Sequence, residues 1–241
     1  MRKLSLKGAR VVASIVLILI MCGVTAVCFM PEKSVSIVSG ESYAPIYSGQ
    51  TETAQVALMF NVYENTDVVN GILDVLREYN AKATFFVGGC WADDNNQTLK
   101  RILDEGHSLG NHGYFHKNHK KLTEAQNFAE INNTHKLVYA ITGYNMHLFA
   151  PPSGAFSVTT LKVAEKLGYK SIMWSKDTID WRDSSVDLVV KRATEVDSGD
   201  FILMHPKTHT LNALPKIIDK IKEKGYNLVT VNDCLAPINN L

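Results

Sequence analysis

"VALMFNVYENTDVVNGILDVLREYNAKATFFVG", residues 56–88, contains a strand, a helix and a second strand in succession. The first segment, 56–62, and the last, 82–88, are short apolar runs typical of buried strands. Between them, residues 68–80 carry apolar side chains three and four positions apart, which predicts an amphipathic helix. Because parallel neighbours need a crossover connection, this unit predicts a parallel sheet covered by helices.

The same alternation continues along the chain. We expect further helices at 98–106, 122–143, 157–167, 186–196 and 211–224, and further strands at 107–113, 147–152, 170–175, 201–205 and 227–231. Seven strands in strict alternation with helices favour an open doubly wound sheet or a slightly incomplete β/α barrel. No GxGxxG or Walker A sequence follows the first strand, so the residues predict no nucleotide-phosphate site.

The N-terminus has the pattern of a membrane anchor. Residues 1–10 contain four basic side chains, and residues 11–30 contain no charged one, which is close to the roughly 20 apolar residues that cross a bilayer. We predict a signal-anchor helix with its basic end in the cytoplasm and the rest of the chain outside. A cleaved signal peptide is the alternative, because Val24-Thr25-Ala26 resembles a small-residue cleavage site.

The predicted organisation has four parts. Residues 1–30 form the basic start and the anchor helix, and residues 31–53 form a spacer rich in small and polar residues. A globular domain occupies residues 54–232, and residues 233–241 form a C-terminal tail.

Composition limits the partners. The chain has 241 residues and a formal net charge of +1. Nucleic-acid binding needs a basic excess, so we expect no nucleic-acid partner. We also expect the protein to be a monomer. Outside the apolar N-terminal run lie Cys90 and Cys234. They are either a disulfide or two small buried thiols, since neither belongs to a CxxC motif.

Polar side chains follow several of the predicted strands. They are Asn61, His112, His116, Asp177, Asp180 and His205. In either architecture, ligands bind at the carboxyl ends of the strands, so these side chains predict one common site.

The histidines allow more than one interpretation. His112 and His116, four residues apart, suit metal ligation, but a loop position without that role is equally open. His205 ends an apolar run, where a buried imidazole needs a polar partner, and Asp180 is the candidate. Such a pair is either a general acid with its orienting carboxylate or a buried hydrogen-bonded pair without chemistry.

The order of the motifs resembles a known family. In sequence they are the strand-end motif "MFNVY" (59–63), "HGYFH" (112–116), "PPSG" (151–154), "DTIDW" (177–181) and "LMH" (203–205), and "ATFFVGG" (83–89) after the first helix adds to them. Together they resemble the polysaccharide deacetylases, which are carbohydrate esterase family 4 or the NodB-homology domain, over residues 54–232. The membrane-anchored, sporulation-associated members of Gram-positive bacteria look most similar. The resemblance implies a distorted (β/α)7-type barrel.

The resemblance also implies chemistry. Members of the family use a divalent metal, usually zinc, to activate water for hydrolysis of N-acetyl carbon–nitrogen bonds in glycans. The implied roles are metal ligands for His112 and His116, the acid for His205, its tuning carboxylate for Asp180, and the sugar groove for Pro152 and Trp181.

Three positions depart from the family pattern. Asn61 stands where the family has its catalytic base, and an amide cannot take up that proton. Val62 replaces the metal-binding carboxylate, and Ala150 replaces the arginine that orients the base. Glu64 is a candidate replacement ligand or base, or an exposed loop residue.

Two functions therefore remain open. One is a membrane-anchored, metal-dependent N-deacetylase-like hydrolase with a weakened site, acting on peptidoglycan or a related wall glycan outside the cell membrane. The other is a catalytically silent module that binds wall glycan on the same fold.

Overall fold

Parallel strands form the centre of the molecule. The computed structural model describes residues 43–49 and 52–236. Its eight strands are β1 (Gln55–Val62), β2 (Ala83–Val87), β3 (Ser108–Asn111), β4 (Leu148–Phe149), β5 (Lys170–Ser171), β6 (Lys176–Asp177), β7 (Phe201–Met204) and β8 (Asn227–Val229). The order is β5-β4-β3-β2-β1-β7-β6, and β8 pairs with the first residues of β1.

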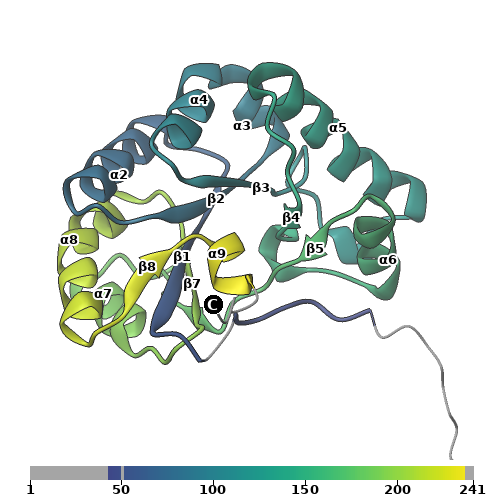
Figure 1. The fold of residues 1–241 in the computed structure, drawn as a ribbon. Coiled ribbons are helices and arrows are strands. Elements are labelled where there is room, and N and C mark those ends of the chain that lie inside the picture. Colours follow the sequence, from purple (N-terminus) through teal and green to yellow (C-terminus); the bar gives the residue numbers. More distant parts are fainter. Residues whose placement is uncertain (1–42, 50–51, 237–241) are drawn as a thin grey trace, which may run out of the picture. The chain divides into compact units, whose positions relative to one another are not determined.

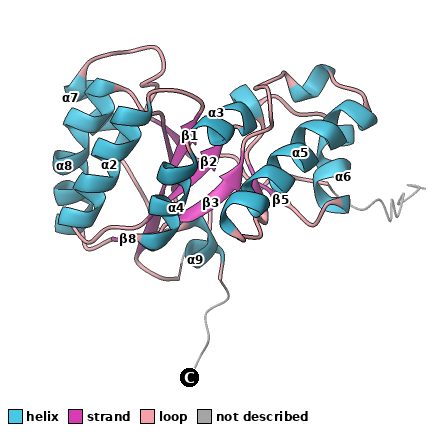
Figure 2. Ribbon diagram, turned by 90° about the horizontal axis from the view of Figure 1, so that it is seen from above, coloured by secondary structure: helices cyan, strands magenta, loops and turns pink. Residues whose placement is uncertain are grey.

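Helices surround these strands in an arc (Figure 1). They are α2 (Thr66–Glu78), α3 (Gly89–Asp94), α4 (Asn96–Asp104), α5 (Glu124–Thr142), α6 (Val158–Lys166), α7 (Val186–Thr194), α8 (Thr208–Glu223) and α9 (Val231–Leu235). Short 3-10 turns lie at His119–Lys121 and Pro152–Gly154. Seen from above, α2, α7 and α8 lie on one side of the strands and α5 and α6 on the other (Figure 2). The architecture is an α/β half-barrel of parallel strands, which confirms the expected fold class.

Apolar side chains pack on both faces of the sheet. A large outer cluster lies between strands and helices, and a smaller inner cluster includes Met59, Phe86 and Leu203. Along β1, Ala57 and Met59 belong to the inner cluster, whereas Val62 belongs to the outer one. This alternation is the period of two of a pleated strand, and it places Asn61 on the inner side.

Two expected strands were wrong in detail, and one helix was not predicted. The strand expected at 170–175 ends at Ser171 as β5, and β6 begins at Lys176, because the chain between them crosses from one edge of the sheet to the other. Helix α3 was not predicted, since six residues are too few to show a helical period. The strand expected at 227–231 ends at Val229, because the hydroxyl of Thr230 accepts the Asp233 N–H and caps α9.

Residues 43–49, which the sequence assigns to the spacer, form a strap against the barrel. The Ile46 N–H donates to the Ser171 carbonyl, and the Met173 N–H donates to the Ile46 carbonyl, both at 2.8 Å. The Gly49 N–H donates to the Gly199 carbonyl at 2.7 Å. The strap therefore connects the segment after β5 with the segment before β7, and Ile46 packs against the inner cluster.

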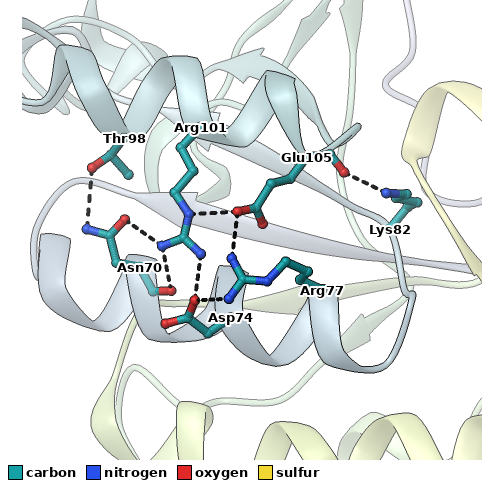
Figure 3. Close-up of polar contacts among 7 residues, drawn as sticks. All are labelled: Asn70, Asp74, Arg77, Lys82, Thr98, Arg101 and Glu105. Carbon is teal, nitrogen blue, oxygen red and sulfur yellow. Dashed lines mark hydrogen bonds and ion pairs between the residues drawn. The ribbon is translucent and has the colours of Figure 1, made fainter.

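An ionic network joins two outer helices (Figure 3). Arg101 of α4 donates to Asp74 of α2 at 2.7 Å and to Glu105 at 2.8 Å, and Arg77 bonds the same two carboxylates. Hydrogen bonding from Arg101 outweighs the effect of burial and holds the pKa of Asp74 below its usual value. The network lies at the helix ends that lead into β2 and β3, opposite the carboxyl ends of the strands.

Two further expectations concern the membrane and the thiols. The anchor predicted at residues 1–30 lies outside the described residues, and within 43–49 and 52–236 no helix is long and apolar enough to span a bilayer. Cys90 and Cys234 are both free thiols. Cys234 is buried, and burial raises the pKa of its thiol to about 11.

The strap gives a first prediction. Ile46→Asp should lower the free energy of unfolding by about 1–3 kcal/mol, because it places a carboxylate against the inner apolar cluster. Its neighbour Tyr47 is 48% exposed, so Tyr47→Asp should change stability by no more than about 0.5 kcal/mol. Urea denaturation of the two variants measures the difference. Equal losses would mean that the strap does not support the barrel.

Candidate functional site

A pocket of about 580 Å³ opens at the carboxyl ends of the strands. The predicted site residues on its wall are Asn61, His112, His116, Asp177, Trp181 and His205. Two others lie behind the wall: Asp180 is buried beneath His205, and Pro152 is buried beside Gly113. Ser153, next to Pro152, lines the pocket instead. Side chains from distant parts of the sequence thus meet at the predicted rim.

His112 is held in one orientation by the backbone. Its Nδ1 lies 2.8 Å from the Ala150 carbonyl oxygen. Because a carbonyl can only accept, Nδ1 carries the proton and Nε2 is left as an acceptor. Burial is the main cause that lowers the pKa of His112 to about 3, so the ring is neutral at physiological pH.

His116 lies beside His112 on the same loop. The centroids of the two rings are 5.2 Å apart, and the ring of Tyr63 lies 5.1 Å from His116 on another side. Burial, and next the nearby His205, lower the pKa of His116. Its φ of 52° is in the left-handed region, as are those of Ser153 and Ile179 around the same pocket. Such backbone strain is concentrated at sites where the surrounding structure fixes a loop.

The histidine loop rests on a buried carboxylate that the sequence did not reveal. Glu130 of α5 is 4% exposed and accepts the N–H groups of Tyr114 at 2.9 Å and Phe115 at 2.8 Å. Lys117 forms an ion pair with it at 3.3 Å. Gly113, with a φ of 71°, leaves no space for a side chain against His119. The only signal in the sequence was a glutamate on the buried face of a predicted helix.

His205 and Asp180 form the pair that the sequence suggested. Nδ1 of His205 lies 2.7 Å from Oδ1 of Asp180, and the His205 N–H donates to Oδ2 at 2.7 Å. The Thr210 hydroxyl also donates to Oδ2, at 2.6 Å. Burial alone would raise the pKa of Asp180, but these hydrogen bonds, first that of the His205 ring, outweigh it and lower that pKa. The pair therefore orients the imidazole and also fixes the loop after β7.

Asn61, Val62 and Ala150, which replace the family's catalytic groups, lie in three different environments. Asn61 lines the pocket, is 5% exposed, and its Oδ1 has no hydrogen-bond partner among the described residues. Val62 is buried in the outer apolar cluster. Ala150 is buried in the inner cluster, where its carbonyl faces His112 and its N–H donates to the Asn111 carbonyl.

Glu64 does not replace the missing carboxylate in this arrangement. It lies at the mouth of the pocket, where its side chain is 58% exposed and forms an ion pair with Lys207. The neighbouring Asn65 side chain donates to the Pro206 carbonyl at 3.0 Å. The loops after β1 and β7 are thus joined across the mouth, and the Glu64 carboxylate is already paired there.

The donor set does not fit the catalytic metal centre that the resemblance implies. Catalytic zinc commonly has three protein ligands, whereas this pocket offers two adjoining imidazoles, and its carboxylates, Glu64 and Asp177, are not grouped with them. Within the part of the chain that the structure describes, no three His, Cys, Asp or Glu side chains are grouped to hold a metal ion. Val62, at the position of the family's metal carboxylate, packs in the outer cluster and supplies no ligand.

Sequence comparisons identify relatives. Residues 48–172 match the family model described as "Polysaccharide deacetylase". The chain is 36% identical to a peptidoglycan-N-acetylglucosamine deacetylase of Bacillus cereus, covering 79% of this chain and 72% of that protein. It is 34% identical to the uncharacterized protein YlxY of Bacillus subtilis, covering 79% of this chain but only 60% of YlxY.

Solved structures agree with this assignment. A wild-type CE4 family pseudoenzyme from Bacillus anthracis superposes with a TM-score of 0.78 at 35% identity, covering 81% of this chain and 70% of that one. A mutant of that pseudoenzyme with restored enzymatic activity superposes equally well, with a TM-score of 0.78 at 34% identity, covering 81% and 72%.

The buried histidine predicts a pH dependence. The pKa of His112 is about 3 in the folded chain and near 6.5 when unfolded, so the unfolded state binds more protons between these values. Stability is therefore full above pH 6.5 and falls as the pH is lowered. The variant His112→Asn lacks this titration. Between pH 8 and pH 5 its free energy of unfolding should therefore fall by about 2 kcal/mol less than that of the native chain.

Urea unfolding of both proteins at the two pH values measures the difference. An equal loss in both would show that His112 is already accessible to protons in the folded state.

Proposed function

Because this chain belongs to the polysaccharide deacetylase family, we propose that it binds cell-wall glycan of the peptidoglycan type in the pocket, with little or no hydrolysis. One observation carries the proposal: the pocket and its aromatic and histidine walls are present, but Asn61 and Val62 supply neither a base nor a third metal ligand. An amide can orient a bound group through hydrogen bonds but cannot deprotonate water.

The relatives support both the binding of wall glycan and the loss of hydrolysis. A relative in Bacillus cereus is named as a peptidoglycan-N-acetylglucosamine deacetylase, and a structural relative in Bacillus anthracis is described as a pseudoenzyme. Wall glycan is thus the ligand class found among relatives. Loss of catalysis on an intact fold also occurs among them.

The predicted location suits this ligand. With a single-pass anchor at residues 11–30 and the globular domain on the extracytoplasmic side, the pocket would lie between the membrane and the wall. The partners are then the glycan and, through the anchor, the cell membrane.

A slow, metal-dependent deacetylase is the second candidate. The retained side chains favour it, since His112 and His116 still adjoin each other and His205 keeps its carboxylate. In this alternative His112 and His116 would hold a divalent metal, which would supply Lewis-acid chemistry. Hydrolysis by this route has to proceed without the family's base.

Binding to purified peptidoglycan and chito-oligosaccharides tests the proposal. Trp181 lines the pocket and is 55% exposed, so Trp181→Ala should weaken binding about tenfold through loss of the stacking surface for a sugar ring. Tyr139 on α5 is equally exposed, at 55%, but lies outside the pocket lining. Tyr139→Ala should leave the affinity unchanged. Equal effects of the two variants, or no binding by the native chain, would contradict the proposal.

A further inference from the structure

We propose that the pocket selects the free-amine form of the wall amino sugar over its N-acetylated form. This inference rests on the proposed function, because it specifies which form of the glycan the same pocket binds. The occupant is a de-N-acetylated hexosamine unit, which carries an ammonium group where the acetamido group was.

The hydrogen-bonding groups at the bottom of the pocket favour an ammonium group. Oδ1 of Asn61 is buried without a partner among the described residues, and an unsatisfied buried acceptor needs a donor from the ligand. Nε2 of His112 is also an acceptor, since Nδ1 donates to Ala150. An ammonium group brings three N–H donors to these acceptors, whereas an acetamido group brings one.

The charges on the pocket wall favour a cation. Lys207 is already paired with Glu64, so these two charges offset each other at the mouth. Asp177 is half-buried on the wall, and none of the lysine or arginine side chains between residues 52 and 236 forms an ion pair with it. Lys176, its neighbour in sequence, pairs with Asp200 at 3.4 Å, and Arg182, whose pKa Asp177 helps to raise, pairs with Asp183 at 2.8 Å. One carboxylate therefore remains for a positively charged ligand.

The aromatic side chains of the pocket also favour a cationic sugar. Trp174, Trp181 and Tyr63 lie on its wall, and the faces of aromatic rings attract cations as well as the apolar faces of sugars. The guanidinium of Arg182 already lies 5.9 Å from the centroid of the Trp181 ring, so Trp174 and Tyr63 carry this argument. The Tyr63 hydroxyl donates to the Tyr114 carbonyl at 2.8 Å, which ties this ring beside His116. A cationic sugar thus gains from the aromatic surfaces, from the acceptors and from the carboxylate together.

The test is calorimetric binding of two tetrasaccharides to the full chain in mild detergent with EDTA. One is the tetramer of glucosamine and the other is the tetramer of N-acetylglucosamine. We expect the amine tetramer to bind about tenfold more tightly at moderate salt. Asp177→Asn removes the charge but keeps the oxygen that accepts the Ile179 N–H at 2.8 Å, so the loop is retained. In this variant the preference should fall to about twofold or less.

Glu195→Gln is the matched control. Glu195 is exposed in a separate groove between α7 and α8, so this variant removes one negative charge away from the pocket. It should keep the full preference. Equal or tighter binding of the N-acetylated tetramer would overturn the inference and leave the proposed function standing. A preference unchanged in Asp177→Asn, or lost equally in Glu195→Gln, would also overturn it. Binding of neither tetramer would refute the proposed function itself.

Discussion

The pleat of β1 decides what the pocket contains, because successive side chains of a strand point to opposite faces. Asn61 therefore faces the pocket, and Val62 packs among the apolar side chains beneath the helices. A valine is stable among those apolar side chains and supplies no ligand to the pocket. The strand thus presents one amide to the pocket where a hydrolase of this family presents a carboxylate base and a metal ligand. The missing chemistry follows from the identities of these two adjacent side chains, an amide and a valine.

The polar residues that remain around the pocket also hold the structure together. Asp180 accepts the His205 ring, the His205 N–H and the Thr210 hydroxyl, so it fixes the loop after β7 whether or not His205 transfers a proton. His112 ties the loop after β3 to the Ala150 carbonyl. Side chains with such structural bonds are costly to lose, because their buried partners would be left unsatisfied. This accounts physically for a pocket that keeps His112 and His205 without its base.

Much of the fold could be predicted from local apolar patterns. Much of the site could be predicted from the polar residues that follow the strands. The βαβ unit at 56–88 and the long helix α5 have clear periods, and polar residues after strands meet at one rim in any parallel barrel. The strap at 43–49 and helix α9 could not be predicted, since their positions depend on contacts with distant segments at Ser171 and Thr84. Glu130 was hidden for the same reason: its role depends on two backbone N–H groups of another element. The ion pair of Glu64 with Lys207 likewise joins residues far apart in sequence.

The central claim is that this pocket binds wall glycan but lacks the groups to hydrolyse it. Acetate release from peptidoglycan and chito-oligosaccharides by the full chain, with and without added zinc or cobalt, beside His112→Ala, tests it most directly. The account predicts bound glycan and no acetate above the level of the His112→Ala variant. Metal-dependent acetate release that disappears in His112→Ala would contradict it, and would mean that the histidine pair supports catalysis without the usual base.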